Sequence, residues 1–258
     1  MTLLRILLAA FRIFIFITTS IIIFILFKLV RLLFSKFTKL RSALNRVIFK
    51  YWSTILIKSL GGKIEVKGWE VKNKTVFVSN HISYLDIIIL NTAHPFAFVA
   101  KSEIAGWPLL GSLAKGVDTI FIDRSNPLAV KNLYKDIDHK ISHGDSVLIF
   151  PEGTTSSGED VLEFKKGIFM PILRAKSHNN SLGCLSIKYH LDKKYGDQKD
   201  KIAWWGDAEF LSHFLSLVMI PNWKVVISAK EYKIGERRSS AIVSKETYGA
   251  VKEEFENI

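Results

Sequence analysis

SNHISYLDIIIL, residues 79–90, joins two apolar runs, TVFVS and DIIIL, through a short polar segment. The polar segment carries an imidazole, His81, and a carboxylate, Asp86. SYLD at 83–86 fits a helix capping box, in which Asp86 helps to start a helix and His81 is an ordinary loop residue. A second explanation is that the two ionisable side chains act together in chemistry, and this stretch alone leaves both open.

The spacing of His81 and Asp86 restricts where they can meet. At roughly 100° per residue, two residues five positions apart point about 140° away from each other on a regular helix. The side chains approach only if His81 lies in the turn before the helix and Asp86 lies in its first turn. A capping role and a paired role for Asp86 are therefore compatible.

Beyond this stretch, short apolar runs rich in β-branched residues alternate with longer helical patterns up to the end of the chain. The expected strands are Thr75–Ser79, Ala97–Ala100, Thr119–Ile122, Ser146–Phe150, Gly183–Tyr189 and Lys224–Ala229. Helices are expected at 127–141 and 164–176, and the charged tail from Lys245 is expected to be a solvated helix. This alternation predicts an α/β domain whose mostly buried sheet is flanked by helices.

The positive charge is concentrated at the beginning of the chain. The 258 residues carry a net charge of +12, yet residues 1–60 hold ten basic residues and no acidic one, since the first is Glu65. The rest has 26 of the 36 basic residues against all 24 acidic ones. Because the charge accompanies the most apolar segment, it favours an anionic membrane surface as partner and argues against nucleic acid.

Two helical segments account for the first sixty residues. Residues 13–27 contain no charge, and the apolar run reaches back to Ile6 with one interruption, Arg12. That longer run suffices to span a bilayer if Arg12 snorkels. ALNRVIFKYWSTILIKSL at 43–60 mixes apolar and cationic residues as an interfacial helix does. We therefore predict a membrane anchor at 1–60 and a second domain at 61–258, with spanning and interfacial anchoring both open.

The orientation of the anchor follows from its flanks. No small-residue cleavage site follows the apolar run, so we expect the segment to be retained. Basic residues are denser after the run (Lys28, Arg31, Lys36, Lys39, Arg41, Arg46) than before it (Arg5, Arg12). The positive-inside rule then predicts a cell-membrane protein whose main domain faces the cytoplasm.

Several other chemistries find no support. GTTSSGE at 153–159 has Glu159 where a P-loop needs lysine, and HKISH at 139–143 lacks the glutamate of a zinc-protease motif. The single cysteine, Cys184, allows no internal disulfide and lies in a strand-like run, as a buried structural thiol does. Neither a metal site nor a bound cofactor is expected.

Three polar blocks taken in order resemble the glycerolipid acyltransferase family, typified by bacterial 1-acylglycerol-3-phosphate acyltransferase. The blocks are NHISYLD at 80–86, TIFIDRSN at 119–126 and FPEGTTS at 150–156, and KSEIAGWPLLG at 101–111 and FKKGIF at 164–169 also look like family segments. The resemblance covers about residues 60–190. It departs from the family at CLSIKY, where Leu185 occupies the place of the family's proline.

The resemblance implies a membrane-bound O-acyltransferase, with acyl-CoA or acyl carrier protein as co-substrate. His81 would be the general base and Asp86 would fix its tautomer, while the lysolipid's own hydroxyl is the nucleophile and no acyl-enzyme forms. The residues implied in binding the acceptor's polar head are Arg124, Glu152, Gly153, Thr154 and Lys165. A non-catalytic membrane lipid-binding protein is the alternative class, although a binding module needs no base.

The acceptor is less defined than the reaction. Lysophosphatidate enzymes usually have FPEGTRS, and here Thr155 replaces that arginine, which weakens the case for a phosphomonoester of charge near −2. FPEGTTSSG and AWWGDAEF at 203–210 look more like the enzymes that acylate lyso-ornithine lipid. Because Arg124 and Lys165 still supply positive charge, we place lysophosphatidate first, giving phosphatidic acid, and lyso-ornithine lipid second.

Overall fold

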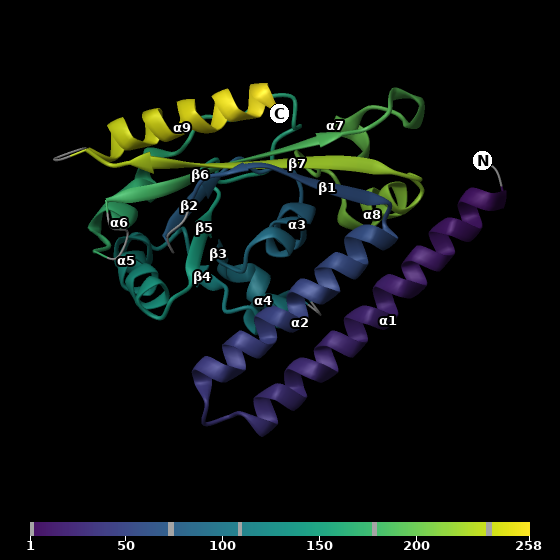
Figure 1. Ribbon diagram of the computed structural model, residues 1–258, viewed down its shortest axis with the longest axis horizontal. Coiled ribbons are helices and arrows are strands. Elements are labelled where there is room, and N and C mark those ends of the chain that lie inside the picture. The colour runs from purple at the N-terminus through teal and green to yellow at the C-terminus, as the bar shows by residue number, and fades with distance from the viewer. Residues whose placement is uncertain (1–2, 72–74, 108–109, 177–179, 236–238) are drawn as a thin grey trace.

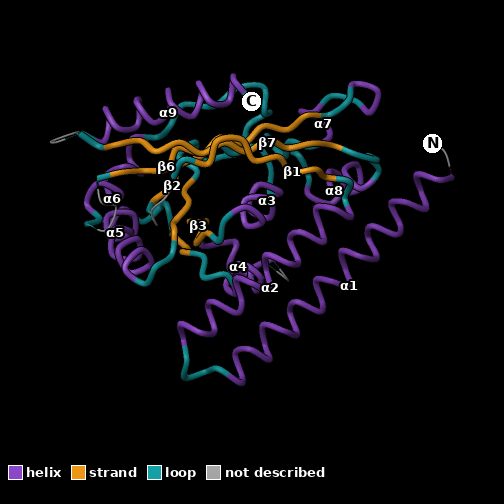
Figure 2. The backbone as a smooth tube through the Cα atoms, in the orientation of Figure 1, coloured by secondary structure: helices purple, strands orange, loops and turns teal. Residues whose placement is uncertain are grey.

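A computed structural model describes residues 3–71, 75–107, 110–176, 180–235 and 239–258 (Figures 1 and 2). The described strands are β1 Gly62–Trp69, β2 Val76–Ser79, β3 Phe96–Lys101, β4 Ile120–Ile122, β5 Ser146–Ile149, β6 Ser181–His190 and β7 Trp223–Lys233. They form one sheet in the order β1-β7-β6-β2-β5-β3-β4. All neighbouring pairs are parallel except β6 and β7, which are antiparallel.

Helices cover both faces of this sheet, so the architecture is the expected α/β class (Figure 1). The helices are α1 Leu3–Leu33, α2 Thr38–Ser59, α3 Leu85–Ala93, α4 Leu110–Gly116, α5 Pro127–Ser142, α6 Phe169–Arg174, α7 Gln198–Lys201, α8 Phe210–Val218 and α9 Ser240–Asn257. Short 3₁₀ turns lie at Ser102–Gly106, Lys166–Ile168 and Lys193–Tyr195. Helix α9 lies over β6 and β7, while α3 and the α1–α2 pair lie on the opposite side of the sheet.

The central strands form because they are short, fully apolar runs. Every residue of β2 and of β5 is buried, as expected for parallel strands that are covered on both faces. Each of the six expected strands is present, with ends that differ by a few residues. Cys184 is buried in β6, in agreement with the structural role expected for it.

Three expectations need correction. Strand β1 was not expected, because its alternation of Gly, Lys and Glu with apolar residues is that of a half-exposed edge strand. The helix expected at 164–176 is confined to α6 and the 3₁₀ turn before it. The tail is helical from Ser240, but it is not fully solvated: Val243, Val251 and Phe255 are buried against the sheet.

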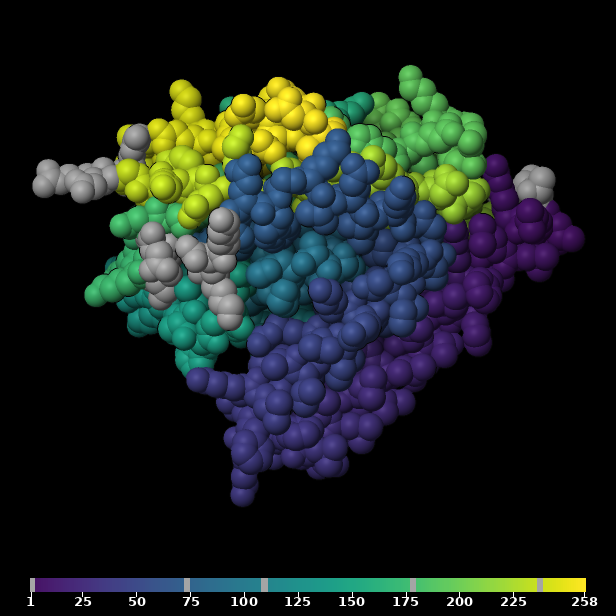
Figure 3. Space-filling model, in the orientation of Figure 1, coloured from purple at the N-terminus to yellow at the C-terminus, as the bar shows by residue number. Residues whose placement is uncertain are grey.

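Helices α1 and α2 form an antiparallel hairpin that packs on the domain (Figures 1 and 3). Helix α1 is the one described helix long and apolar enough to cross a bilayer. Its Phe16 ring lies 5.0 Å from that of Phe214 on α8. Arg12 does not snorkel: its guanidinium donates to the carbonyl oxygens of Val218, Ile220 and Pro221 and is buried. One face of α1 is therefore fixed to the domain along much of the helix.

Candidate active site

The site begins in the loop that follows β2, at the carboxyl end of the strand. Asn80 is buried, its Nδ2 donates to Ile187 O at 2.9 Å, and its Oδ1 accepts from Ile187 N at 2.9 Å. Both polar atoms of the side chain are thus bound to β6. This clamp fixes the backbone from which the next residue, His81, projects.

His81 and Asp86 are brought together. His81 Nδ1 lies 2.7 Å from Asp86 Oδ2, and α3 begins at Leu85, so His81 is in the turn and Asp86 in the first helical turn as the spacing predicts. Asp86 Oδ2 also accepts from the backbone N–H groups of Ile82 at 2.7 Å and Ser83 at 3.0 Å. One carboxylate therefore caps α3 and holds the imidazole.

A third residue, Tyr189 on β6, completes the environment of Asp86. Its hydroxyl donates to Asp86 Oδ1 at 2.6 Å, inside the core. Burial and the neighbouring carboxylate raise the pKa of Tyr189 well above its usual value, so the hydroxyl keeps its proton. Both oxygens of the buried Asp86 are consequently hydrogen-bonded.

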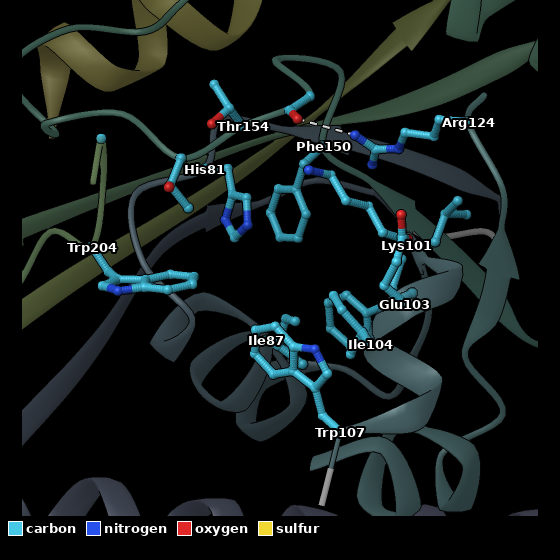
Figure 4. Close-up of a pocket in the computed structure, with 16 residues that line it drawn as sticks. His81, Ile87, Lys101, Glu103, Ile104, Trp107, Arg124, Phe150, Thr154 and Trp204 are labelled. Atoms are coloured by element: carbon cyan, nitrogen blue, oxygen red, sulfur yellow. Dashed lines mark hydrogen bonds between the residues drawn. The ribbon is translucent and has the colours of Figure 1, made fainter. Parts of the chain in front are cut away.

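The imidazole of His81 is held flat against a second ring. Its centroid lies 3.9 Å from that of Phe150, with 12° between the planes (Figure 4). The side chain is 18% exposed, and Nδ1 is occupied by Asp86. No residue in the described ranges hydrogen-bonds Nε2, so the second ring nitrogen is available to a ligand.

His81 lines a cavity of about 450 Å³. Its walls come from the ends of β3 and β5, from the 3₁₀ turn after β3 and from the segment after α7 (Figure 4). The other lining residues are Ile87, Phe98, Val99, Ala100, Lys101, Glu103, Ile104, Trp107, Arg124, Phe150, Gly153, Thr154, Thr155, Trp204 and Gly206. The described residues include no group of three side chains suited to hold a metal ion.

Glu152 lies behind the cavity wall and not in it. The residue is 2% exposed, its Oε2 accepts from His81 N at 3.1 Å, and its Oε1 accepts from Leu162 N at 3.0 Å. Burial raises the pKa of Glu152 to about 8, against the opposing effect of these two hydrogen bonds. Glu152 thus positions the backbone of His81, whereas the family resemblance implied a direct contact with the acceptor.

The remaining site residues gather around Gly153. Arg124 Nη1 donates to Gly153 O at 3.0 Å and forms no ion pair with the adjacent Asp123, which accepts from Ser125 (Figure 4). Gly153 has a φ of 74°, and a Cβ there would lie 2.8 Å from Lys165 Nζ. A side chain at this position would therefore be strained and would collide with Lys165. Arg124, Gly153 and Thr154 line the cavity, and Lys165 approaches it from behind.

A second, apolar cavity of about 180 Å³ also reaches His81. It extends between α2, α3, α4 and α8, and Phe16 of α1 also lines it. It shares His81, Ile87, Phe98, Ala100, Ile104, Trp107 and Trp204 with the first cavity. The imidazole therefore lies where a cavity that carries charged side chains, Lys101, Glu103 and Arg124, meets an apolar cavity.

Residues 63–184 match the protein family described as Acyltransferase. This segment is an acyltransferase-family domain. It contains His81, Asp86 and every other residue that the sequence placed in the site. The family resemblance drawn from the sequence is confirmed.

Similar proteins carry two different descriptions. The chain is 30% identical over 166 residues to a lyso-ornithine lipid O-acyltransferase of Rhodobacter capsulatus. This match covers 64% of this chain and 59% of the relative. The chain is 34% identical over 132 residues to a 1-acyl-sn-glycerol-3-phosphate acyltransferase of Neisseria meningitidis, covering 51% of this chain and 52% of the relative. The matches thus span little more than half the length of these relatives.

The fold of the acyltransferase domain and its helical hairpin also matches a solved structure. The 1-acyl-sn-glycerophosphate (LPA) acyltransferase PlsC from Thermotoga maritima superposes with a TM-score of 0.63, over 92% of this chain and 95% of that one. The identity is 19%, so the comparison establishes the shared fold. The superposition covers 92% of the chain and is not limited to the segment that carries the polar blocks.

Sequence reasoning missed three groups of the candidate site. Tyr189 lies near the end of the strand SLGCLSIKYH, where nothing local marks a tyrosine as a hydrogen-bond partner. Phe150 was predicted as a strand residue, and its stacking on the imidazole of His81 was not predicted. Trp204 lies in AWWGDAEF, noted only for its likeness to other sequences, and its backbone N–H donates to Ile82 O at 2.9 Å. Each role depends on a contact between segments far apart in the sequence.

Proposed function

We propose that the protein transfers a fatty acyl group from a thioester to the free hydroxyl of a lysolipid. The single observation that carries the proposal is the imidazole of His81, bound at Nδ1 by Asp86 and open at Nε2 toward both cavities. A carboxylate at Nδ1 selects the tautomer with its lone pair on Nε2 and stabilises the imidazolium. His81 is thereby prepared to act as a general base.

The reaction balances without an acyl-enzyme. Nε2 of His81 takes the proton of the lysolipid hydroxyl as its oxygen attacks the thioester carbonyl. The C–O bond forms, the C–S bond breaks, and the departing thiolate receives the proton from the imidazolium. Asp86 is held in place by hydrogen bonds from the hydroxyl of Tyr189 and two backbone N–H groups.

The two cavities suit the two ends of such substrates. The apolar one, walled by Phe49, Trp52 and Leu85 among others, suits an acyl chain. The larger one presents Lys101, Arg124 and the Thr154 side chain to a polar head group. The reacting carbonyl belongs between them, at His81.

The exposed apolar face of the hairpin supports attachment of the protein to a membrane. Along α1, large apolar side chains that face away from the domain are exposed, including Phe14, Ile17, Ile21, Ile25 and Leu29. Because the other face is fixed to the domain through Arg12 and Phe16, the helix lies along the protein surface in this conformation. We infer that α1 enters the membrane interface side-on and keeps His81 where a bilayer lipid can reach it.

We further infer that the acyltransferase domain faces the cytoplasm of the cell membrane, as the density of basic residues after α1 indicates. A water-soluble donor, acyl-CoA or acyl carrier protein, is then available on the same side. No cofactor takes part in the proposed reaction.

Lysophosphatidate is the first proposed acceptor and lyso-ornithine lipid the second. Lys101 and Arg124 at the cavity, with Lys165 close to Gly153, favour an anionic head group. Thr155 and Glu103 favour the second acceptor. Thr155 lines the cavity without a charge, and the Glu103 carboxylate, which also lines it, suits a head group that carries an amine.

An acyl-transfer assay with purified full-length protein tests the proposal. Both acceptors at equal concentration compete for acyl-CoA and for acyl carrier protein in separate reactions, and His81→Ala is the control. Phosphatidic acid is the expected main product. Acylation of lyso-ornithine lipid alone would reverse the order of the acceptors, and no transfer to any lysolipid would favour a lipid-binding protein.

A further inference from the structure

A basic cavity of about 330 Å³ lies between the α1–α2 hairpin and α4. The cavity is lined by the end of α1, the beginning of α2, α4, and Asp118 shortly after α4. The residues are Phe24, Phe27, Lys28, Arg31, Arg41, Asn45, Ser112, Lys115, Gly116 and Asp118. It shares none of them with the two cavities that meet at His81.

Four cations surround this cavity without acidic partners. Lys28, Arg31, Arg41 and Lys115 form no ion pair within the ranges that the structure describes. The one acidic lining residue, Asp118, lies 3.7 Å from Arg46 and 3.8 Å from Lys140, both outside the cavity. The positive charge is therefore not neutralised by the protein itself.

Two oxygen atoms of the lining residues have no hydrogen-bond partner in the described part of the chain, Asn45 Oδ1 and Asp118 Oδ2. Asn45 is 8% exposed, and both oxygen atoms are closed to solvent in this conformation. A ligand that fills the cavity therefore meets the four cations and not these oxygen atoms.

The walls are rigid and adjoin the membrane-facing surface. Phe27 is packed so closely on α4 that a Cβ at Gly116 would lie 2.1 Å from its ring. Lys28 lies 4.6 Å above the ring of Phe24. On the same helix, Ile25, Leu29 and Leu32 are exposed apolar residues, so an acyl chain leaving the cavity would find apolar surface beside it.

We propose that this cavity binds the head group of an anionic membrane phospholipid. The phosphate contacts the four cations. Such a site fixes the turn of the hairpin at the depth of the lipid phosphates. It differs from a diffuse basic surface because the four cations line one cavity between α1, α2 and α4.

An acidic face of a carrier protein is the competing occupant. Phe24 and Phe27 line the cavity beside the cations. A head-group phosphate fits a volume of about 330 Å³, whereas the side chains of a folded partner would contact mainly the exposed Lys28, Arg31 and Lys115. The geometry therefore favours the lipid.

The test compares two charge variants of the full-length protein. One carries Gln at Lys28, Arg31, Arg41 and Lys115. The matched control carries Gln at Lys36, Lys39, Lys50 and Lys58, which are exposed cations near or on α2 and outside the cavity. Both lose the same charge, and thermal melting followed by circular dichroism verifies that both are folded.

Binding is measured by co-sedimentation with phosphatidylcholine vesicles, with and without phosphatidylglycerol, at physiological salt. A charge near an anionic surface contributes roughly fivefold in affinity, and salt screens this diffuse part. We expect the cavity variant to lose its preference for phosphatidylglycerol at least tenfold more than the control. Equal losses in the two variants overturn the proposal.

Two further arms separate the sources of the ligand. Calorimetric titration with monomeric short-chain phosphatidylglycerol should give binding that the cavity variant weakens and the control variant keeps, and equal binding of inorganic phosphate would overturn the lipid assignment. Loss of acyl carrier protein binding in the cavity variant, with vesicle binding intact, would overturn it as well. None of these readouts requires acyl transfer, so they stand independently of the proposed reaction.

Discussion

The loop around Asp86 and the α1–α2 hairpin differ in whether their polar groups have partners within the protein. At Asp86, both carboxylate oxygens accept hydrogen bonds, from His81 Nδ1, two backbone N–H groups and Tyr189. On the hairpin, large apolar residues are exposed, and its Lys28, Arg31 and Arg41 line a cavity without acidic partners among the described residues. The polar groups of the first region have their partners within the protein, and we propose that a membrane supplies the partners of the second.

This difference separates preorganisation from attachment. A site whose hydrogen bonds are already made does not have to reorganise during the reaction. A surface that exposes apolar area and unpaired charge is stabilised when a bilayer covers it. Changes in the loop should therefore alter turnover and leave membrane binding unaffected, and changes in the hairpin should do the opposite.

The largest effect is expected at His81. His81→Ala should lower kcat/KM by about 10²–10⁴-fold, because a positioned general base contributes that much. The double variant His81→Ala with Asp86→Asn should lose little more kcat/KM than His81→Ala alone, because the effects of residues that act as one unit are not additive. Steady-state kinetics of the two single variants and the double variant measure this. Losses that simply multiply would show that the two residues act separately.

A comparable loss, in binding, is expected on the exposed face of α1. Ile25→Asp with Leu29→Asp removes two apolar side chains from the interface, each contributing about 1.5–3 kcal/mol if buried in lipid. The protein should move from the membrane fraction to the soluble fraction, even in high salt. Leu162→Asp with Met170→Asp is the matched control, since both residues are exposed and lie outside the hairpin. Release of the control as well would mean that the hairpin is not the attachment site.

A smaller effect is expected at Tyr189. Tyr189→Phe removes one donor to Asp86, and hydrogen bonds to charged groups contribute about 1.5–3 kcal/mol, so kcat/KM should fall about ten- to hundredfold. Tyr134→Phe, on α5, should leave kcat/KM unchanged. An unchanged kcat/KM in Tyr189→Phe would reduce Tyr189 to a packing residue.

The smallest effect concerns Glu152 and pH. Burial raises its pKa to about 8 from an ordinary 4.5, so the folded protein keeps a proton that the unfolded chain releases between these values. The free energy of unfolding should therefore decrease as pH rises through this window. In Glu152→Gln this decrease should be absent. Melting temperatures of both proteins from pH 5 to pH 8 test it, and parallel profiles would contradict the raised pKa.

The sequence predicted the fold well where the signal was local. Buried parallel strands such as β2 and β5 are continuous apolar runs, and the spacing of His81 and Asp86 predicted the turn and the helix that bring them together. Strand β1 was missed because Lys63, Glu65 and Lys67 alternate along a half-exposed edge, which is also the pattern of a polar loop.

The rest of the site could not be predicted because it depends on distant contacts. Tyr189 meets Asp86 across 103 positions, and nothing in a strand of apolar residues marks one hydroxyl as a partner. A membrane-spanning first helix would have required Arg12 to snorkel, but the carbonyl groups that bind Arg12 lie at and after the end of α8, in a different part of the chain. The family resemblance implied that Glu152 helps to bind the acceptor, and only the fold shows that its carboxyl group accepts from the backbone of His81.

The contacts of Arg12 also fix an order of assembly. Its first carbonyl partner, that of Val218, lies 206 positions later. At 5–20 residues per second, a ribosome takes about 10–40 s to make the intervening chain. During that interval α1 has been made but the carbonyl groups at 218–221 that bind Arg12 have not. The docking of α1 on the domain through Arg12 is therefore among the last steps of assembly, and the proposed membrane contact of α1 is open to the helix earlier.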